Sequence, residues 1–79
     1  MTITNHDLID RVLASKYHTG ANNHRIHTTI DRYREAASMC RLFEKAGMEK
    51  EDRYNHWKSL FDKCEQQLTI FADTGFIEV

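Results

Sequence analysis

The chain has 79 residues and a formal net charge of −1, with 41% apolar and 29% charged residues. This length allows one small domain, residues 1–79, and the composition excludes a disordered chain. No apolar run approaches the roughly 20 residues that a membrane-spanning helix requires, so we expect no membrane partner. The nearly balanced charge points to no partner by itself.

The first residues, MTITNHDLIDRV, contain two aspartates and no basic segment ahead of an apolar one, which is unlike a secretory signal. We therefore expect a cytoplasmic location. In that setting Cys40 and Cys64 are expected to be free thiols.

A first helix is predicted over about residues 5–17. Thr4 is the expected N-cap, with Asp7 three residues later, close to the spacing of a capping box. Ile3 and Leu8 then occupy the two positions of a hydrophobic staple. Five residues form one narrow apolar stripe at helical spacing: Leu8, Ile9, Val12, Leu13 and Tyr17.

A second helix is predicted over about residues 24–46. Its apolar residues repeat with spacings of four and three, the pattern of a heptad seam: Ile26, Ile30, Tyr33, Ala37 and Cys40. Ala36 and Phe43 widen this seam on one side. The preceding segment, HTGANN, is expected to be a joint, because Gly20 permits a positive φ and an asparagine caps the helix that follows.

A third helix is predicted over about residues 49–72, with acidic residues at its start that suit the helix dipole. Its seam has no polar interruption: Tyr54, Trp57, Phe61, Cys64, Leu68 and Phe71. Gly75 follows the helix end. A short apolar tail remains, which we expect to fold back on the core: Phe76, Ile77 and Val79.

The two seams are out of phase across Gly47, which favours a hairpin over one continuous helix. If the two helices are folded antiparallel about residues 47–49, the residue numbers of facing seam pairs add up to 97 or 98 throughout, from Ile26 with Phe71 to Cys40 with Trp57. The predicted fold class is therefore all-α: a long antiparallel helical hairpin with a short N-terminal helix, a three-helix domain that dimerises into a larger helical bundle.

Three histidines surround the joint, namely His18, His24 and His27. Neutral imidazole is a good ligand for zinc or copper, but the hairpin places only Asp73 near them as a further ligand. We therefore interpret them as groups of the joint and the helix start, and predict no metal site.

Catalytic groups are also missing from the pattern. Cys40 and Cys64 lie one heptad apart along the hairpin axis, roughly 10 Å, which is too far for a disulfide. Both occupy the apolar seam, where a reactive thiolate is disfavoured. The serines have no converging histidine and acid. We predict no cofactor, no catalytic residue and no enzymatic activity.

Basic residues are concentrated in the middle of the chain. Residues 11–45 carry a formal charge of +4, whereas the segment from residue 46 onward carries −3. A cationic strip on the second helix is a candidate contact for nucleic acid or an acidic protein: Arg25, His27, Arg32, Arg34 and Arg41. Asp31 and Glu35 interrupt this face.

The helical seams leave apolar residues over, and so small a chain cannot bury all of them. We assign a protein interface, with a partner or a second copy, to Met39, Leu42, Ala46, Tyr54, Trp57, Leu60 and Ile70. The predicted function is a small non-enzymatic protein-binding module. It would act as a homodimeric adaptor, or as an inhibitor or regulator that masks a larger protein, as accessory proteins of bacteriophages do. The alternative is a nucleic-acid-binding regulator that uses the cationic strip.

Overall fold

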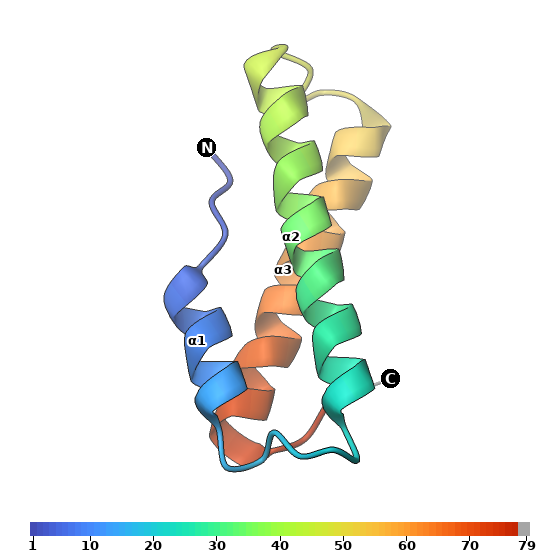
Figure 1. Ribbon diagram of the computed structural model, residues 1–79. Coiled ribbons are helices and arrows are strands. Elements are labelled where there is room, and N and C mark those ends of the chain that lie inside the picture. Colours follow the sequence, from blue (N-terminus) through green and yellow to red (C-terminus); the bar gives the residue numbers. More distant parts are fainter. Residues whose placement is uncertain (78–79) are drawn as a thin grey trace.

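A computed structural model describes residues 1–77, which form three helices: α1 (His6–Ala14), α2 (Asn23–Lys45) and α3 (Asp52–Thr74). Residues 1–77 contain no strand, so the predicted all-α class is confirmed. α2 and α3 lie side by side and run in opposite directions, and α1 lies beside the end of the bundle where α2 starts and α3 stops (Figure 1). α1 packs mainly against α3.

The start of α1 differs from the prediction. Asn5, not Thr4, is the N-cap, because the Asn5 side chain accepts a hydrogen bond of 3.0 Å from the Leu8 N–H. Both residue types cap helices well, and the tertiary structure decides between them, since Thr4 is buried. The predicted hydrophobic staple between Ile3 and Leu8 is also wrong, because Ile3 is 67% exposed whereas Leu8 is buried in the core.

The end of α1 comes three residues earlier than predicted, at Ala14. Ser15 has extended backbone, and its hydroxyl accepts a hydrogen bond from the Tyr17 N–H at 3.1 Å. This local bond replaces a further helical turn. Tyr17 therefore reaches the core from the joint, where its ring meets the edge of Phe71. Leu13, which was assigned to the apolar stripe, is 37% exposed.

The joint between α1 and α2 is held by Asn22. Its side chain accepts from the Thr19 N–H at 3.0 Å and donates to the Tyr17 carbonyl at 2.7 Å. Asn22 precedes α2, but its side chain makes no hydrogen bond to that helix. Of the two asparagines that could cap α2, Asn22 holds the N-cap position, but its side chain bonds within the joint.

A tight turn separates α2 from α3. Gly47 has a φ of 68°, and the Met48 N–H donates to the Phe43 carbonyl at 2.8 Å. The Gly47 N–H also bonds to Glu44, which completes a Schellman motif and ends α2 at Lys45. α3 begins at Asp52, three residues later than predicted, since residues 48–51 belong to the turn.

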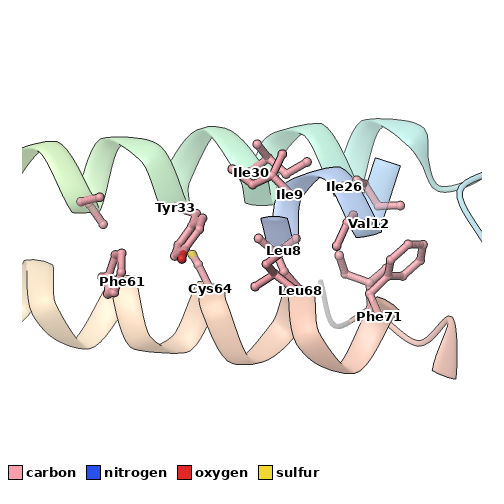
Figure 2. Close-up of a cluster of buried hydrophobic side chains, with 13 residues drawn as sticks. Leu8, Ile9, Val12, Ile26, Ile30, Tyr33, Phe61, Cys64, Leu68 and Phe71 are labelled. Atoms are coloured by element: carbon pink, nitrogen blue, oxygen red, sulfur yellow. The ribbon is translucent and has the colours of Figure 1, made fainter. Parts of the chain in front are cut away.

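The predicted seams supply the core (Figure 2). All five seam residues of α2 are buried, and so are the four seam residues of α3 from Phe61 to Phe71. Tyr33 stacks on Phe61, with ring centroids 4.9 Å apart and planes 24° apart. Tyr54 and Trp57, at the end near the turn, are half-buried. Of the predicted apolar tail, Ile77 is buried and Phe76 is 65% exposed, and Val79 lies outside the described residues.

Glycine-to-alanine substitutions distinguish backbone strain at a positive φ from steric crowding of the added Cβ. Gly75 has a φ of 80°, and an added Cβ would lie 2.5 Å from Cδ1 of Tyr17, so G75A strains the backbone and moves the ring. Gly47 also has a positive φ, but among residues 1–77 no atom crowds it, so G47A carries backbone strain of about 1 kcal/mol. Gly20 has neither problem and is the matched control.

We expect the free energy of unfolding, measured by urea titration, to fall most for G75A, less for G47A and least for G20A. A G75A variant as stable as G20A would contradict the packing of Tyr17 against the end of α3.

Candidate functional site

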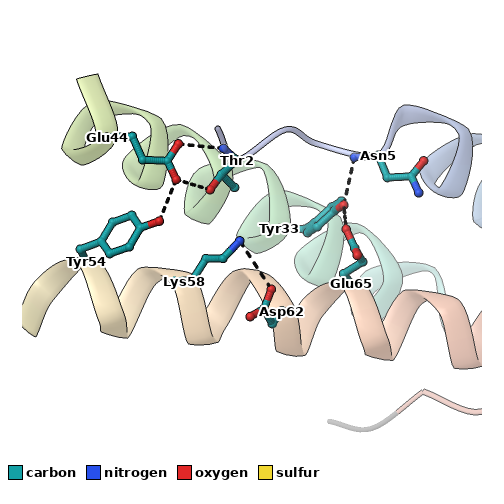
Figure 3. A network of polar contacts seen from close by, with 8 residues as sticks. All are labelled: Thr2, Asn5, Tyr33, Glu44, Tyr54, Lys58, Asp62 and Glu65. Carbon is teal, nitrogen blue, oxygen red and sulfur yellow. Dashed lines mark hydrogen bonds and ion pairs between the residues drawn. The ribbon is translucent and has the colours of Figure 1, made fainter. Parts of the chain in front are cut away.

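Two packed helices leave a groove on each side of their seam. On the first side of the α2–α3 pair, the chain places α1 and the extended residues 1–5 that precede it (Figure 3). This N-terminal segment is fixed by hydrogen bonds at both of its ends, one set near the turn and one set at the middle of the bundle.

Glu44 holds the N-terminal segment near the turn. Its carboxylate accepts hydrogen bonds from the Thr2 N–H at 2.7 Å, the Thr2 hydroxyl at 2.6 Å and the Tyr54 hydroxyl at 2.8 Å. The bonds from Thr2 stabilise the charged form and lower the pKa of Glu44 from 4.5 to about 2. The same carboxylate raises the pKa of Tyr54.

Tyr33 holds the segment at the middle of the bundle. Its hydroxyl accepts from the Asn5 N–H at 3.0 Å and donates to the Glu65 carboxylate. Burial, followed by the bond to Glu65, raises the pKa of Tyr33 to about 12. A residue predicted only as part of the seam is therefore also the polar link among α2, α3 and the N-terminal segment.

The second groove is open. It contains a hollow of about 290 Å³ near the start of α2. Nine residues line it: His24, Arg25, Thr28, Thr29 and Arg32 from α2, and Leu60, Lys63, Cys64 and Gln67 from α3. No residue of α1 contributes, and within residues 1–77 no aspartate or glutamate lines the hollow. We call this surface the open groove.

The walls of the open groove are cationic and its floor is weakly polar. Arg25 and Arg32 are exposed on the α2 wall, and Lys63 is exposed on the α3 wall. On the floor, the Thr29 hydroxyl donates to a carbonyl of its own helix, and burial raises the pKa of the Cys64 thiol. The floor thus provides neutral surface, and the walls provide three positive charges.

Beyond the hollow, toward the turn, the same helix faces carry mainly apolar residues. Helical spacing of three and four places Ala36, Met39 and Phe43 on the same face of α2 as Arg32, but Ala36 and Phe43 are buried and only Met39 is half-buried. On α3, Trp57 follows Leu60 on the corresponding face, and both are half-buried against the core. The Arg53 guanidinium lies over the Phe43 ring, 5.6 Å from its centroid. The cationic hollow is therefore followed, toward the turn, by the half-buried side chains of Met39 and Trp57.

Of the seven predicted interface residues, Leu60 lines the open groove, and Met39 and Trp57 are half-buried on the same helix faces nearer the turn. Leu42, 60% exposed, and Ala46 lie on the outer side of α2, and Ile70, 41% exposed, lies on the outer side of α3. The Tyr54 hydroxyl is bonded to Glu44 on the other side of the hairpin.

The predicted cationic strip is divided between two sides of α2. Arg25 and Arg32 line the open groove, whereas Arg34 lies about 200° around the helix from Arg32. Arg41 donates to the Thr2 carbonyl at 3.4 Å and to the Ser38 hydroxyl at 3.2 Å. The ring centroid of His27 lies 5.6 Å from that of His18, and the two rings are arranged edge to face.

Sequence reasoning missed Lys63 and Gln67 as groove residues. A signal for them exists in the sequence. Along α3, the positions spaced by three and four from Arg53 to Gln67 hold no acid: Arg53, Trp57, Leu60, Lys63, Cys64 and Gln67. Asp62 and Glu65 lie on other faces of that helix.

The histidines and thiols of the described chain do not form a ligand cluster. Residues 1–77 contain no group of three histidine, cysteine, aspartate or glutamate residues placed to hold a metal ion. Both rings of the His18–His27 pair lie beside the joint, where the His18 nitrogens contact the Leu13 carbonyl and the Asn23 side chain. Asp73 pairs with Arg11 at 3.2 Å. The open groove therefore offers noncovalent contacts: charge, hydrogen bonding and apolar surface.

Comparison of the chain with protein-family models, with curated proteins and with solved structures found no match. Within residues 1–77, no helix combines the length and the apolar character needed to cross a membrane.

Protonation of Glu44 is expected to release part of the N-terminal segment. Because the folded pKa of about 2 lies below the ordinary 4.5, the stabilisation from Glu44 is complete above pH 4.5 and is lost as the pH falls toward 2. For E44Q we expect a loss of about 1 kcal/mol at pH 7 and a weaker pH dependence below pH 4.5. Urea titration at several pH values measures both. Glu49→Gln, an exposed position in the adjacent turn, is the control, and equal pH slopes in E44Q and the unmodified chain would contradict this role of Glu44.

Proposed function

We propose that the chain is a small non-enzymatic protein-binding module that acts as an inhibitor or adaptor by covering part of a larger protein. One observation carries the proposal: one side of the α2–α3 pair is covered by the chain itself, and the other holds a hollow with cationic walls, next to the half-buried side chains of Met39 and Trp57. Grooves between helices are common docking places for helical segments of other proteins.

The chemistry of the open groove favours binding over catalysis. Its candidate nucleophile, Cys64, is buried and 2% exposed, and burial raises the pKa of its thiol, which keeps it protonated at neutral pH. Cys40 is fully buried elsewhere on the seam. Arginine, by contrast, remains charged and pairs well with carboxylates at interfaces.

Nucleic-acid binding is the second candidate, because the acid-free walls with Arg25, Arg32 and Lys63 also suit phosphates. The half-buried apolar side chains in and beside the open groove argue against nucleic-acid binding. Met39, Trp57 and Leu60 would gain little from a phosphate backbone, whereas a protein partner would bury them.

Self-association is part of the proposal and follows from the exposed apolar residues outside the open groove. Leu42 on α2 and Ile70 on α3 remain accessible on the outer sides of the bundle. Light scattering on the purified chain tests this directly, since a dimer has twice the 9.3 kDa mass of one chain.

Two matched variants test the proposed function. Leu60→Glu places a charge in the open groove, and Gln66→Glu places the same charge on an exposed position of the same helix that does not line the groove. We expect a tagged chain to retain a protein partner from nuclease-treated extract of its native host. L60E should lose at least tenfold of the retained partner and Q66E should not, with helicity of both checked by circular dichroism.

Retention of no protein, or equal retention by both folded variants, would contradict the proposal. Retention that disappears with nuclease treatment would favour the nucleic-acid candidate instead.

A further inference from the structure

Resting on the proposed function, we infer that the open groove binds an amphipathic helix of another protein whose apolar stripe is flanked by acidic residues one heptad apart. The chemistry of the partner follows from the placement of Arg25, Arg32 and Lys63 around a neutral floor, and from half-buried Leu60 in the hollow and Trp57 beside it.

The dimensions of the open groove suit a helix. Its two walls are themselves helices, so a third helix packed along them would complete a bundle with ridges entering grooves. On α2 the hollow extends from His24 to Arg32, about 12 Å at 1.5 Å per residue, which about two turns of a partner helix would cover. Half-buried Leu60 and Trp57 would meet the apolar stripe of that helix.

The spacing of the cations gives the register. Arg25 and Arg32 are seven residues apart on one helix face, about 10.5 Å along the axis. Carboxylates at i and i+7 of a docked helix have the same separation, so both could pair with these guanidiniums at once. Lys63, on the opposite wall, would meet an acid on the other flank of the same helix. Arg–carboxylate pairs are frequently bidentate, which fixes orientation.

The positive charge of the open groove favours an acidic partner over a second copy of the chain. Three formal positive charges stand around the hollow, and within residues 1–77 no acid of the chain lines it. A symmetric pairing of two copies through this face would set each cation against its equivalents or their neighbours, because both copies would present the same patch. Such like-charge contacts disfavour binding, so an acidic helix from another protein is the better match.

The test uses a fluorescent peptide of about 22 residues, long enough to cover the hollow, with leucines at spacings of three and four and glutamates on both flanks. A second peptide carries glutamine in place of every glutamate. Fluorescence anisotropy measures binding to the full chain and to two variants, R32E and R34E. These two make the same charge change on exposed residues of α2, but only Arg32 lines the open groove.

We expect the glutamate peptide to bind the unmodified chain at least tenfold more tightly than the glutamine peptide does. R32E should weaken binding of the glutamate peptide at least tenfold, R34E should leave it within about twofold, and rising salt should weaken it. A lysine-flanked peptide should bind R32E better than it binds the unmodified chain.

Equal binding of the glutamate and glutamine peptides, or equal effects of R32E and R34E, would overturn the inference, and so would no binding of either peptide. If a host protein is still lost in L60E and retained in Q66E, the proposed function stands and only the acidic-helix chemistry fails. Binding of a single-stranded or duplex oligonucleotide that R32E abolishes and R34E preserves would assign the open groove to nucleic acid. Loss of self-association in R32E alone would assign it to a second copy.

Discussion

Tyr33 stacks on Phe61 at the middle of the seam between α2 and α3, and the rest of the structure depends on this packing. It sets the register in which small and large seam residues alternate, from Ile26 and Phe71 at one end to Cys40 near the other. The Tyr33 hydroxyl then ties the N-terminal segment to Glu65 of α3. If α2 and α3 packed in another register, the residues of the two helices that line the open groove would not face one another.

The two sides of the α2–α3 pair differ in the charged groups that they carry. Toward the N-terminal segment, Glu44 and Glu65 accept hydrogen bonds from backbone N–H groups or hydroxyls, so their charges are used within the fold. Toward the open groove, the charges that line the hollow are cationic, and within residues 1–77 none of them is in an ion pair. Glu44 and Glu65 are thus bonded within the fold, whereas Arg25, Arg32 and Lys63 are the charges that the proposed partner would contact.

The sequence was sufficient for the helices and for the residues that they bury, because heptad spacing reports directly which face avoids water. It was not sufficient for the ends of α1. Thr4 and Asn5 are both good caps, and the choice between them depends on the burial of Thr4 by distant parts of the chain. The spacing placed Arg34 and Arg41 in a different column of α2 from Arg25 and Arg32, but periodicity does not say which column the N-terminal segment lies beside. Lys63 could have been found by asking which helix faces lack acids.

The most direct test of this account is solution NMR on a mixture of isotope-labelled and unlabelled chains. The packing predicts nuclear Overhauser contacts within one chain between the rings of Tyr33 and Phe61, whose centroids are 4.9 Å apart, and from Asn5 to the Tyr33 ring region. If the ring contact were absent from well-resolved spectra, or appeared only between labelled and unlabelled chains, the register of α2 on α3 would be wrong. The open groove would then not exist in the form described.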